Sequence, residues 1–179
     1  MLGLGADEAS ALFVVFHEGL PYVKDTMEHM KNGAETEGVT RTILGRIRHF
    51  DTWEPKVYRK DVRLPALTID RAVSTYGPNI RRAYLHKSLN AIVQGSAADL
   101  MKMAIVKCSK AGIFDAIGVP RLVVHDELIY SMKEGYKLKD FRAMRDVMEN
   151  AIKFKVPIRT EGEIGPNWAN TTPVKDSRK

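Results

Sequence analysis

The chain has 179 residues, of which 44% are hydrophobic and 28% are charged, the composition of an ordinary soluble globular protein. No apolar run approaches ~18 residues, which argues against a transmembrane helix, and the first ten residues lack the basic and apolar segments of a signal peptide. The single cysteine, Cys108, has no partner for an internal disulfide. We interpret it as a small core residue of a protein in a reducing compartment.

Hydrophobic periodicity and turn residues predict a mixed set of helices and strands. In chain order they are helices over residues 6–17 and 21–37, a hairpin over 39–50, a long helix over 80–111, a hairpin over 122–132, a helix over 137–154 and a last strand over 157–164. Residues 51–78 contain three prolines and predict no clear element. These elements predict an α+β fold, with a small antiparallel sheet packed against several helices, including one long helix.

The chain is expected to divide into four segments. They are helices and a hairpin over residues 1–50, an atypical basic connection over 51–79, the long helix with the second hairpin, a helix and the last strand over 80–170, and a polar tail over 171–179. The helix over 137–154 is expected to turn Leu138, Phe141, Met144, Met148 and Ile152 inward.

The net charge of +6 is concentrated in residues 41–82. This segment holds ten lysines and arginines against four acidic residues, and the rest of the chain is neutral. A basic segment of this kind is a candidate surface for nucleic acid. A solvated basic surface without a partner explains the same pattern.

A polar stripe occurs on the predicted long helix. His86, Asn90 and Gln94 are spaced at i, i+4 and i+8, so they share one face. An imidazole and two carboxamides can donate or accept hydrogen bonds without fixed charge, which suits contacts with base edges in a minor groove. Alternatively, these side chains satisfy buried backbone groups.

Other positions of the long helix are apolar or small. The face expected to be buried holds Leu85, Leu89, Ile92 and Val93. A patch of small residues, where another backbone could approach closely, is formed by Gly95, Ala97 and Ala98.

Two adjacent acids interrupt the second hairpin. Asp126 and Glu127 stand between the apolar runs 122–124 and 128–130, both of which predict half-buried strands. Carboxylates at such a place are costly unless they are exposed, paired or bound to a cation.

Two motifs together carry a resemblance to a known family. QGSAADLMK (94–102) and LVVHDEL (122–128) resemble the C-terminal part of the polymerase domain of family A DNA polymerases, which include bacterial DNA polymerase I and many phage replicative enzymes. Further similar segments are residues 4–23, 39–48 and 161–169, so that the resemblance covers roughly 2–50 and 80–170. His86 and the GPNWA motif favour the phage branch.

The resemblance implies a role for each of the polar features. The acidic hairpin would belong to the polymerase palm, where Asp126 ligates two catalytic Mg²⁺ ions and Glu127 is a secondary ligand. The expected DNA-binding residues are Arg46 at the DNA backbone, His86, Asn90 and Gln94 along the minor groove, and His125 near the primer terminus. The implied partners are primer–template DNA and a dNTP. The implied location is the cytoplasm of a bacterium or of a phage-infected host cell.

The resemblance also implies that part of the active site lies outside this sequence. The family's other metal-binding aspartate and the fingers helix that holds the dNTP precede the matched region, and neither motif occurs here. We therefore expect the isolated chain to be inactive and a complementary N-terminal polymerase chain to complete the site. Two other interpretations are an inactive truncated fragment and a non-catalytic module that binds duplex DNA.

Overall fold

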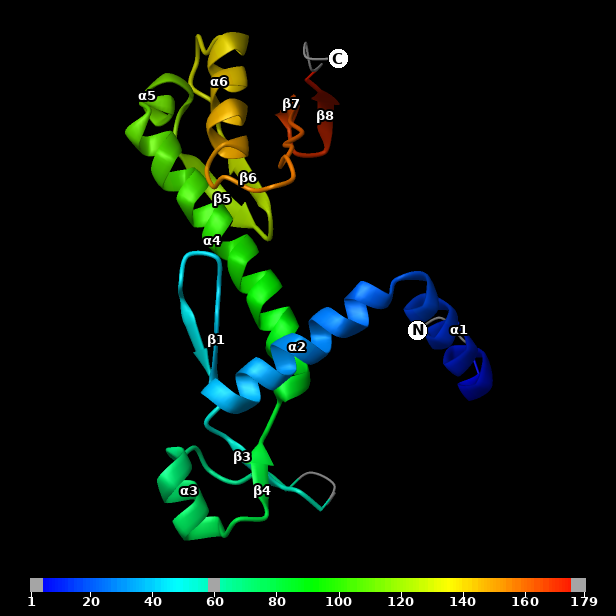
Figure 1. Cartoon of the computed structure of the whole chain (residues 1–179). Helices are drawn as coiled ribbons and strands as arrows, with labels where there is room; N and C mark the ends of the chain where they lie inside the picture. The colour runs from blue at the N-terminus through cyan, green and yellow to red at the C-terminus, as the bar shows by residue number, and fades with distance from the viewer. Residues whose placement is uncertain (1–4, 58–61, 175–179) are drawn as a thin grey trace. The chain divides into compact units, whose positions relative to one another are not determined.

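The structure is a computed structural model that describes residues 5–57 and 62–174, and Figure 1 labels most of its elements. The helices are α1 (Ala6–Gly19), α2 (Pro21–Glu37), α3 (Ile69–Tyr76), the 3₁₀ turn η1 (Leu85–Lys87), α4 (Ser88–Lys110), α5 (Ile113–Ile117) and α6 (Leu138–Glu149). The strands are β1 (Val39–Arg41), β2 (Ile47–His49), β3 (Trp53–Pro55), β4 (Ile80–Arg82), β5 (Pro120–Val124), β6 (Glu127–Tyr130), β7 (Glu163–Asn167) and β8 (Asn170–Pro173). None of the helices in these ranges is long and apolar enough to cross a bilayer.

The strands form antiparallel pairs. Within the described residues there are four two-stranded ladders, β1–β2, β3–β4, β5–β6 and β7–β8. The expected α+β class with one long helix is therefore confirmed, although the strands do not join into one sheet. The chain divides into two compact units, Met1–Ser96 and Ala97–Lys179, and each is described by itself below.

The first unit is held together around the buried side chain of Arg82. Its Nε donates to the Glu35 carbonyl at 3.0 Å, and its Nη1 donates to the Phe50 carbonyl at 2.9 Å. The guanidinium also lies over the Trp53 ring, 4.8 Å from its centroid. One basic side chain thus joins the end of α2, the end of the first hairpin and strand β3.

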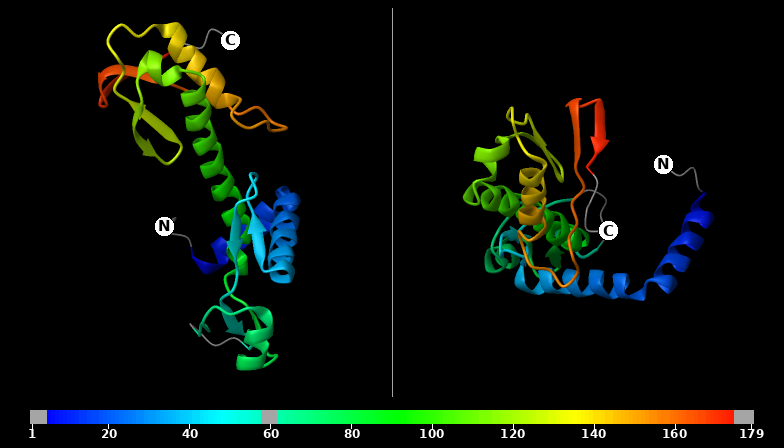
Figure 2. Two further views of the ribbon diagram at one scale, coloured as in Figure 1. Left: turned by 90° about the vertical axis from the view of Figure 1, so that its left-hand side faces the viewer. Right: turned by 90° about the horizontal axis from the view of Figure 1, so that it is seen from above.

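Residues 51–82 contain regular structure that the sequence did not predict. Strand β3 pairs with β4, and helix α3 packs on them, as Figure 2 shows from a second side. Trp53, Ala72 and Ile80, one from each element, form a small buried cluster. Each strand has only three residues, and the pairs join positions 25 to 29 apart. Such short strands leave little periodicity in the sequence.

The core of the second unit is formed by the C-terminal half of α4 with α5 and α6. Its buried residues are Cys108, Ile113, Ile117, Phe141 and Met144. Cys108 is fully buried, which confirms its interpretation as a core residue, and burial raises the pKa of its thiol. Of the side chains expected to point inward from α6, Leu138 is instead 44% exposed.

Several predicted boundaries were wrong. The long helix begins at Ser88 and not at residue 80, because residues 80–82 are strand β4 and residues 85–87 form a 3₁₀ turn. Helix α6 ends at Glu149, so Ile152 lies outside it. The predicted strand over 157–164 starts only at Glu163, and it forms a hairpin with β8, which uses part of the expected polar tail.

Candidate functional site

The acidic hairpin β5–β6 closes through a very short turn. Val124 pairs with Glu127, so His125 and Asp126 alone form the turn. His125 has φ 53°, a left-handed conformation that a two-residue hairpin turn demands and that glycine normally supplies. A non-glycine residue in this conformation is uncommon, and such residues cluster at functional sites.

The hairpin tip and one flank are open to solvent. His125, Asp126 and Glu127 are all exposed, so neither carboxylate is desolvated. The expectation that both flanks are half-buried was wrong for Leu122 and Val123 of β5, which are 50% and 53% exposed. It was right for Val124 and for residues 128–130 of β6, which are half-buried. The hairpin therefore presents both charged and apolar groups outward.

The two acids could contribute to a metal site only together with other ligands. Carboxylate oxygens are the ligands that Mg²⁺ prefers, and Asp126 at an exposed turn is placed to offer them. Within residues 5–57 and 62–174, however, no group of three or more His, Cys, Asp or Glu could hold a metal ion. The donor chemistry of the two acids fits Mg²⁺, and a complete site at this turn would need further ligands.

The predicted polar stripe is shorter than expected. Asn90 and Gln94 lie one turn apart on α4 and are exposed, but His86 lies in the 3₁₀ turn before the helix. The break follows Tyr84, whose φ of 61° is left-handed. On the face expected to be buried, Leu85 is buried, whereas Val93 is 58% exposed.

The loop of the first hairpin docks on α4 beside Gln94. The Arg46 guanidinium donates to the Gly95 carbonyl at 2.7 Å, and the Ile43 amide donates to the Ser96 hydroxyl at 3.0 Å. A Cβ on Gly95 would come within 2.5 Å of the Thr42 methyl group. The close approach at Gly95 is thus made by the side chains of Thr42 and Arg46 and not by another backbone, while Ala97 and Ala98 are exposed. Arg46, expected at the DNA backbone, also has this structural role.

The basic segment 41–82 is partly structural. Arg82 is buried, and Arg63 and Arg81 both form ion pairs with Glu54, at 3.2 and 2.8 Å. Arg41, Lys56 and Arg71 are exposed, and Arg59 and Lys60 lie outside the described residues. A smaller set of cations than the sequence suggested is therefore available to a partner.

Comparison with known proteins identifies the family. Residues 1–170 match the family described as DNA polymerase family A. The chain belongs to DNA polymerase family A. The match includes residues 51–78, which the sequence resemblance had left unassigned.

Family A relatives are similar along nearly the whole chain. DNA polymerase I of Deinococcus radiodurans is 29% identical over 171 residues, which are 95% of this chain and 16% of the relative. A thermostable DNA polymerase I of Thermus filiformis is 29% identical over 93% of this chain and 18% of its own length. A DNA-directed DNA polymerase of Pseudomonas phage M6 is 29% identical over 92% of this chain and 20% of its own length. The chain thus spans a fifth or less of these relatives.

A solved family A structure is similar as well. The POL domain of Pol1 from M. smegmatis, in complex with DNA primer–template and dNTP, aligns with a TM-score of 0.64 and 26% identity. The alignment covers 87% of this chain and 24% of that domain's chain.

The candidate polymerase residues fall in two groups. Arg46, His86, Asn90 and Gln94 belong to the first unit, where the docked hairpin loop brings Arg46 next to the helical turn that carries Gln94. His125, Asp126 and Glu127 belong to the second unit and are adjacent at the hairpin tip. The sequence did not indicate that Arg63 and Lys87 lie over the ring of Tyr84. Tyr84 falls within the predicted long helix, and that prediction concealed its left-handed conformation.

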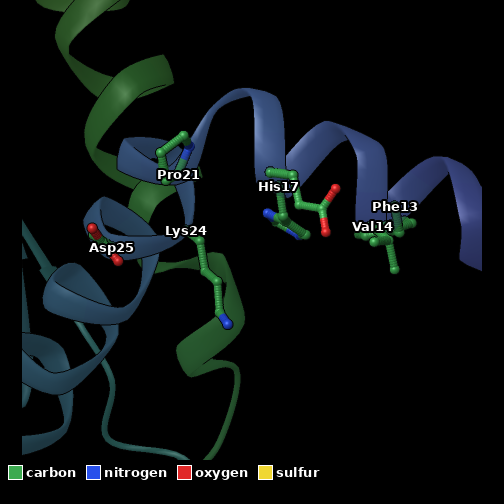
Figure 3. A pocket seen from close by; sticks show the side chains of 7 residues that line it. Phe13, Val14, His17, Pro21, Lys24 and Asp25 are labelled. Carbon is green, nitrogen blue, oxygen red and sulfur yellow. The ribbon is translucent and has the colours of Figure 1, made fainter.

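A separate hollow lies between α1 and α2, and none of the predicted site residues lines it. Figure 3 shows Phe13, Val14 and His17 of α1 on one side and Pro21, Lys24 and Asp25 of α2 on the other. Helix α1 buries no residue, and Phe13 and Val15 are 66% and 65% exposed. The hollow is open and carries no group that sequence reasoning assigned to the polymerase site.

Proposed function

We propose that this chain is the C-terminal part of a template-directed DNA polymerase that acts in DNA replication. In this role it binds primer–template DNA and contributes one carboxylate, Asp126, to an Mg²⁺ site, with Glu127 as a secondary ligand. The observation that carries the proposal is an exposed carboxylate on a left-handed two-residue turn, in a chain of this family.

The hairpin geometry supports the metal role of Asp126. A carboxylate on the turn of a paired ladder has few backbone degrees of freedom, which suits a ligand with tight positional tolerance. Mg²⁺ held by Asp126, with Glu127 as a secondary ligand, would supply charge stabilisation for phosphoryl transfer. The chain's own part is to hold the Asp126 oxygens in place, because such reactions depend mainly on positioning and charge.

The first unit would hold the duplex. Asn90 and Gln94 present exposed amides that can donate to acceptors in the minor groove, and His86 lies in the turn that precedes them. Contacts of this kind test base-pair shape without reading sequence. His125, beside Asp126, would lie near the primer terminus. The binding of primer–template and dNTP by the M. smegmatis relative supports the same partners here.

The site would be completed by a complementary N-terminal polymerase chain. The described residues contain no cluster of three metal-ligating side chains, and the relatives are five or more times longer than the matched region. The incomplete donor set also favours a second candidate function, a non-catalytic module that binds duplex DNA.

Co-expression with an N-terminal family A polymerase chain that carries the fingers and the other metal-binding aspartate tests the proposal. We expect Mg²⁺-dependent primer extension by the pair and none by residues 1–179 alone. Robust extension by the purified chain alone would show that it contains the whole active site. Duplex binding without extension by the pair would favour the non-catalytic module.

A further inference from the structure

Tyr84 is the centre of a cationic cluster to which the polymerase resemblance assigned no role. The Arg63 guanidinium carbon lies 5.2 Å from the centroid of the Tyr84 ring, and the Lys87 ammonium nitrogen lies 4.9 Å from it. Both distances are within the range of cation–π attraction. The two cations come from separate segments, so the ring brings together charges that would otherwise repel.

The backbone at Tyr84 places this ring. Tyr84 adopts φ 61° between strand β4 and the 3₁₀ turn, and its carbonyl accepts a hydrogen bond from the Lys87 amide at 2.8 Å. A left-handed conformation is unfavourable for a residue other than glycine, so the surrounding structure must hold Tyr84 in it. The turn also brings the His86 ring to 6.5 Å from the Tyr84 ring.

Glu54 fixes the outer cations of the cluster. Its carboxylate binds Arg63 at 3.2 Å and Arg81 at 2.8 Å, and its side chain is only 17% exposed. The side chains of Arg63 and Arg81 are 37% and 46% exposed. Two arginines therefore share one largely covered carboxylate, and with Lys87 at the Tyr84 ring the cluster holds three cations against one acid, so positive charge remains on the surface.

We propose that Tyr84, Arg63, Arg81 and Lys87 form a binding site for the sugar–phosphate backbone of duplex DNA. The inference rests on the proposed function, since it specifies how the duplex is held beside His86. Long cationic side chains lose rotamer entropy when a ligand orders them, which weakens binding. Here the ring and Glu54 order them before binding, so an arriving phosphate meets prepositioned donors.

The chemistry of the neighbouring residues favours DNA over an acidic protein. The cluster adjoins His86, and the chain continues into the exposed amides of Asn90 and Gln94. Cations followed by uncharged donors and acceptors match a phosphate backbone next to base edges. An acidic protein surface would require no such amides.

Salt-dependent binding of the whole chain to a labelled duplex tests this site. Each phosphate contact contributes about 0.9 to the slope of log affinity against log salt. The double variant Arg63→Gln/Lys87→Gln should lower that slope by about 2 and weaken binding at least about tenfold at low salt. Tyr84→Leu should lower the slope by less, and Tyr84→Phe should leave it unchanged because the ring remains. Lys24→Gln, an exposed lysine of α2, is the matched control and should change the slope by less than about 0.3.

The outcomes separate this inference from the proposed function. An unchanged slope in the double variant, with normal binding by the parent chain, overturns the phosphate site alone. No duplex binding by the parent chain overturns both proposals. Equal competition by polyglutamate would show a general anion surface and would also overturn the phosphate site. If the double variant melts below the parent in circular dichroism, the exposed single variant Lys87→Gln gives the same test, with an expected slope change of about 1.

Discussion

The two hairpins that carry the polymerase residues differ in how they are supported. The loop of β1–β2 docks on α4 through Arg46 and Ser96, and Arg82 holds the residue that follows the hairpin. The tip of β5–β6 is exposed, and so are two apolar residues of β5. The first hairpin finds its partners within its own unit. The second presents carboxylates and apolar surface outward, as expected of a site that other groups complete.

The largest expected effect is the loss of the Asp126 carboxylate in a completed active site. Metal ligands in phosphoryl transfer supply several kcal/mol of transition-state stabilisation, so Asp126→Ala should lower the extension rate at least ~10³-fold. Glu127→Gln should be milder, because Glu127 is proposed as a secondary ligand. Single-turnover primer extension measures both. If Asp126→Ala keeps more than about a tenth of the activity, the hairpin acids are not the metal site.

Among changes around the first hairpin, removal of the Arg82 side chain should lower the free energy of unfolding most. Hydrogen bonds from a charged donor contribute about 1.5–3 kcal/mol each, and Arg82→Leu loses two of them. We expect the free energy of unfolding to fall by about 3 kcal/mol in urea denaturation.

Arg81→Leu is the matched control for this change. The Arg81 side chain, which forms an ion pair with Glu54, is 46% exposed. Surface ion pairs contribute about 0–1 kcal/mol to the free energy of unfolding. Equal losses in the two variants would contradict the central role of Arg82.

A methyl group at Gly95 should separate the first hairpin from α4. The added Cβ would meet the Thr42 methyl group at 2.5 Å, and overpacking of this kind costs about 1–3 kcal/mol. Gly95→Ala should therefore destabilise the chain and weaken duplex binding, as thermal melts and anisotropy would measure.

Gly33→Ala on α2 controls for the helix propensity of alanine. No atom lies within 4 Å of its added Cβ, so the change should stabilise the chain by up to about 1 kcal/mol. If Gly95→Ala also stabilises the chain, the hairpin loop does not pack against the helix.

Local patterns correctly predicted helix α2 and the two central hairpins. Helix α2 has the predicted bounds, Pro21 to Glu37, because proline suits its first turn and Gly38 ends it with φ 73°. The two central hairpins were located correctly, since β-branched runs flank their turns. The acids at the second turn were also recognised, although their metal role stays a prediction.

Features that depend on distant residues could not be predicted. In the sequence Arg82 is one cation of a basic segment. Its burial depends on hydrogen bonds to the carbonyls of residues 35 and 50, which are distant in the sequence. The short strands β3 and β4 exist because they pair with each other and with α3. The left-handed residue Tyr84 was hidden by the helical pattern around it, and with it the cationic cluster.

The smallest expected effect concerns the backbone at the tip of the second hairpin. His125 holds φ 53° without the freedom of glycine. His125→Gly should remove the cost of the left-handed conformation, but glycine also raises the entropy of the unfolded chain. The free energy of unfolding should therefore rise by at most about 1 kcal/mol. The variant should therefore melt slightly higher than the parent, while a completed polymerase should extend primers more slowly because the imidazole beside Asp126 is gone. A higher melting temperature with unchanged extension would assign His125 to the turn alone. A lower melting temperature would show that the histidine side chain supports the hairpin, in contrast to the open tip described here.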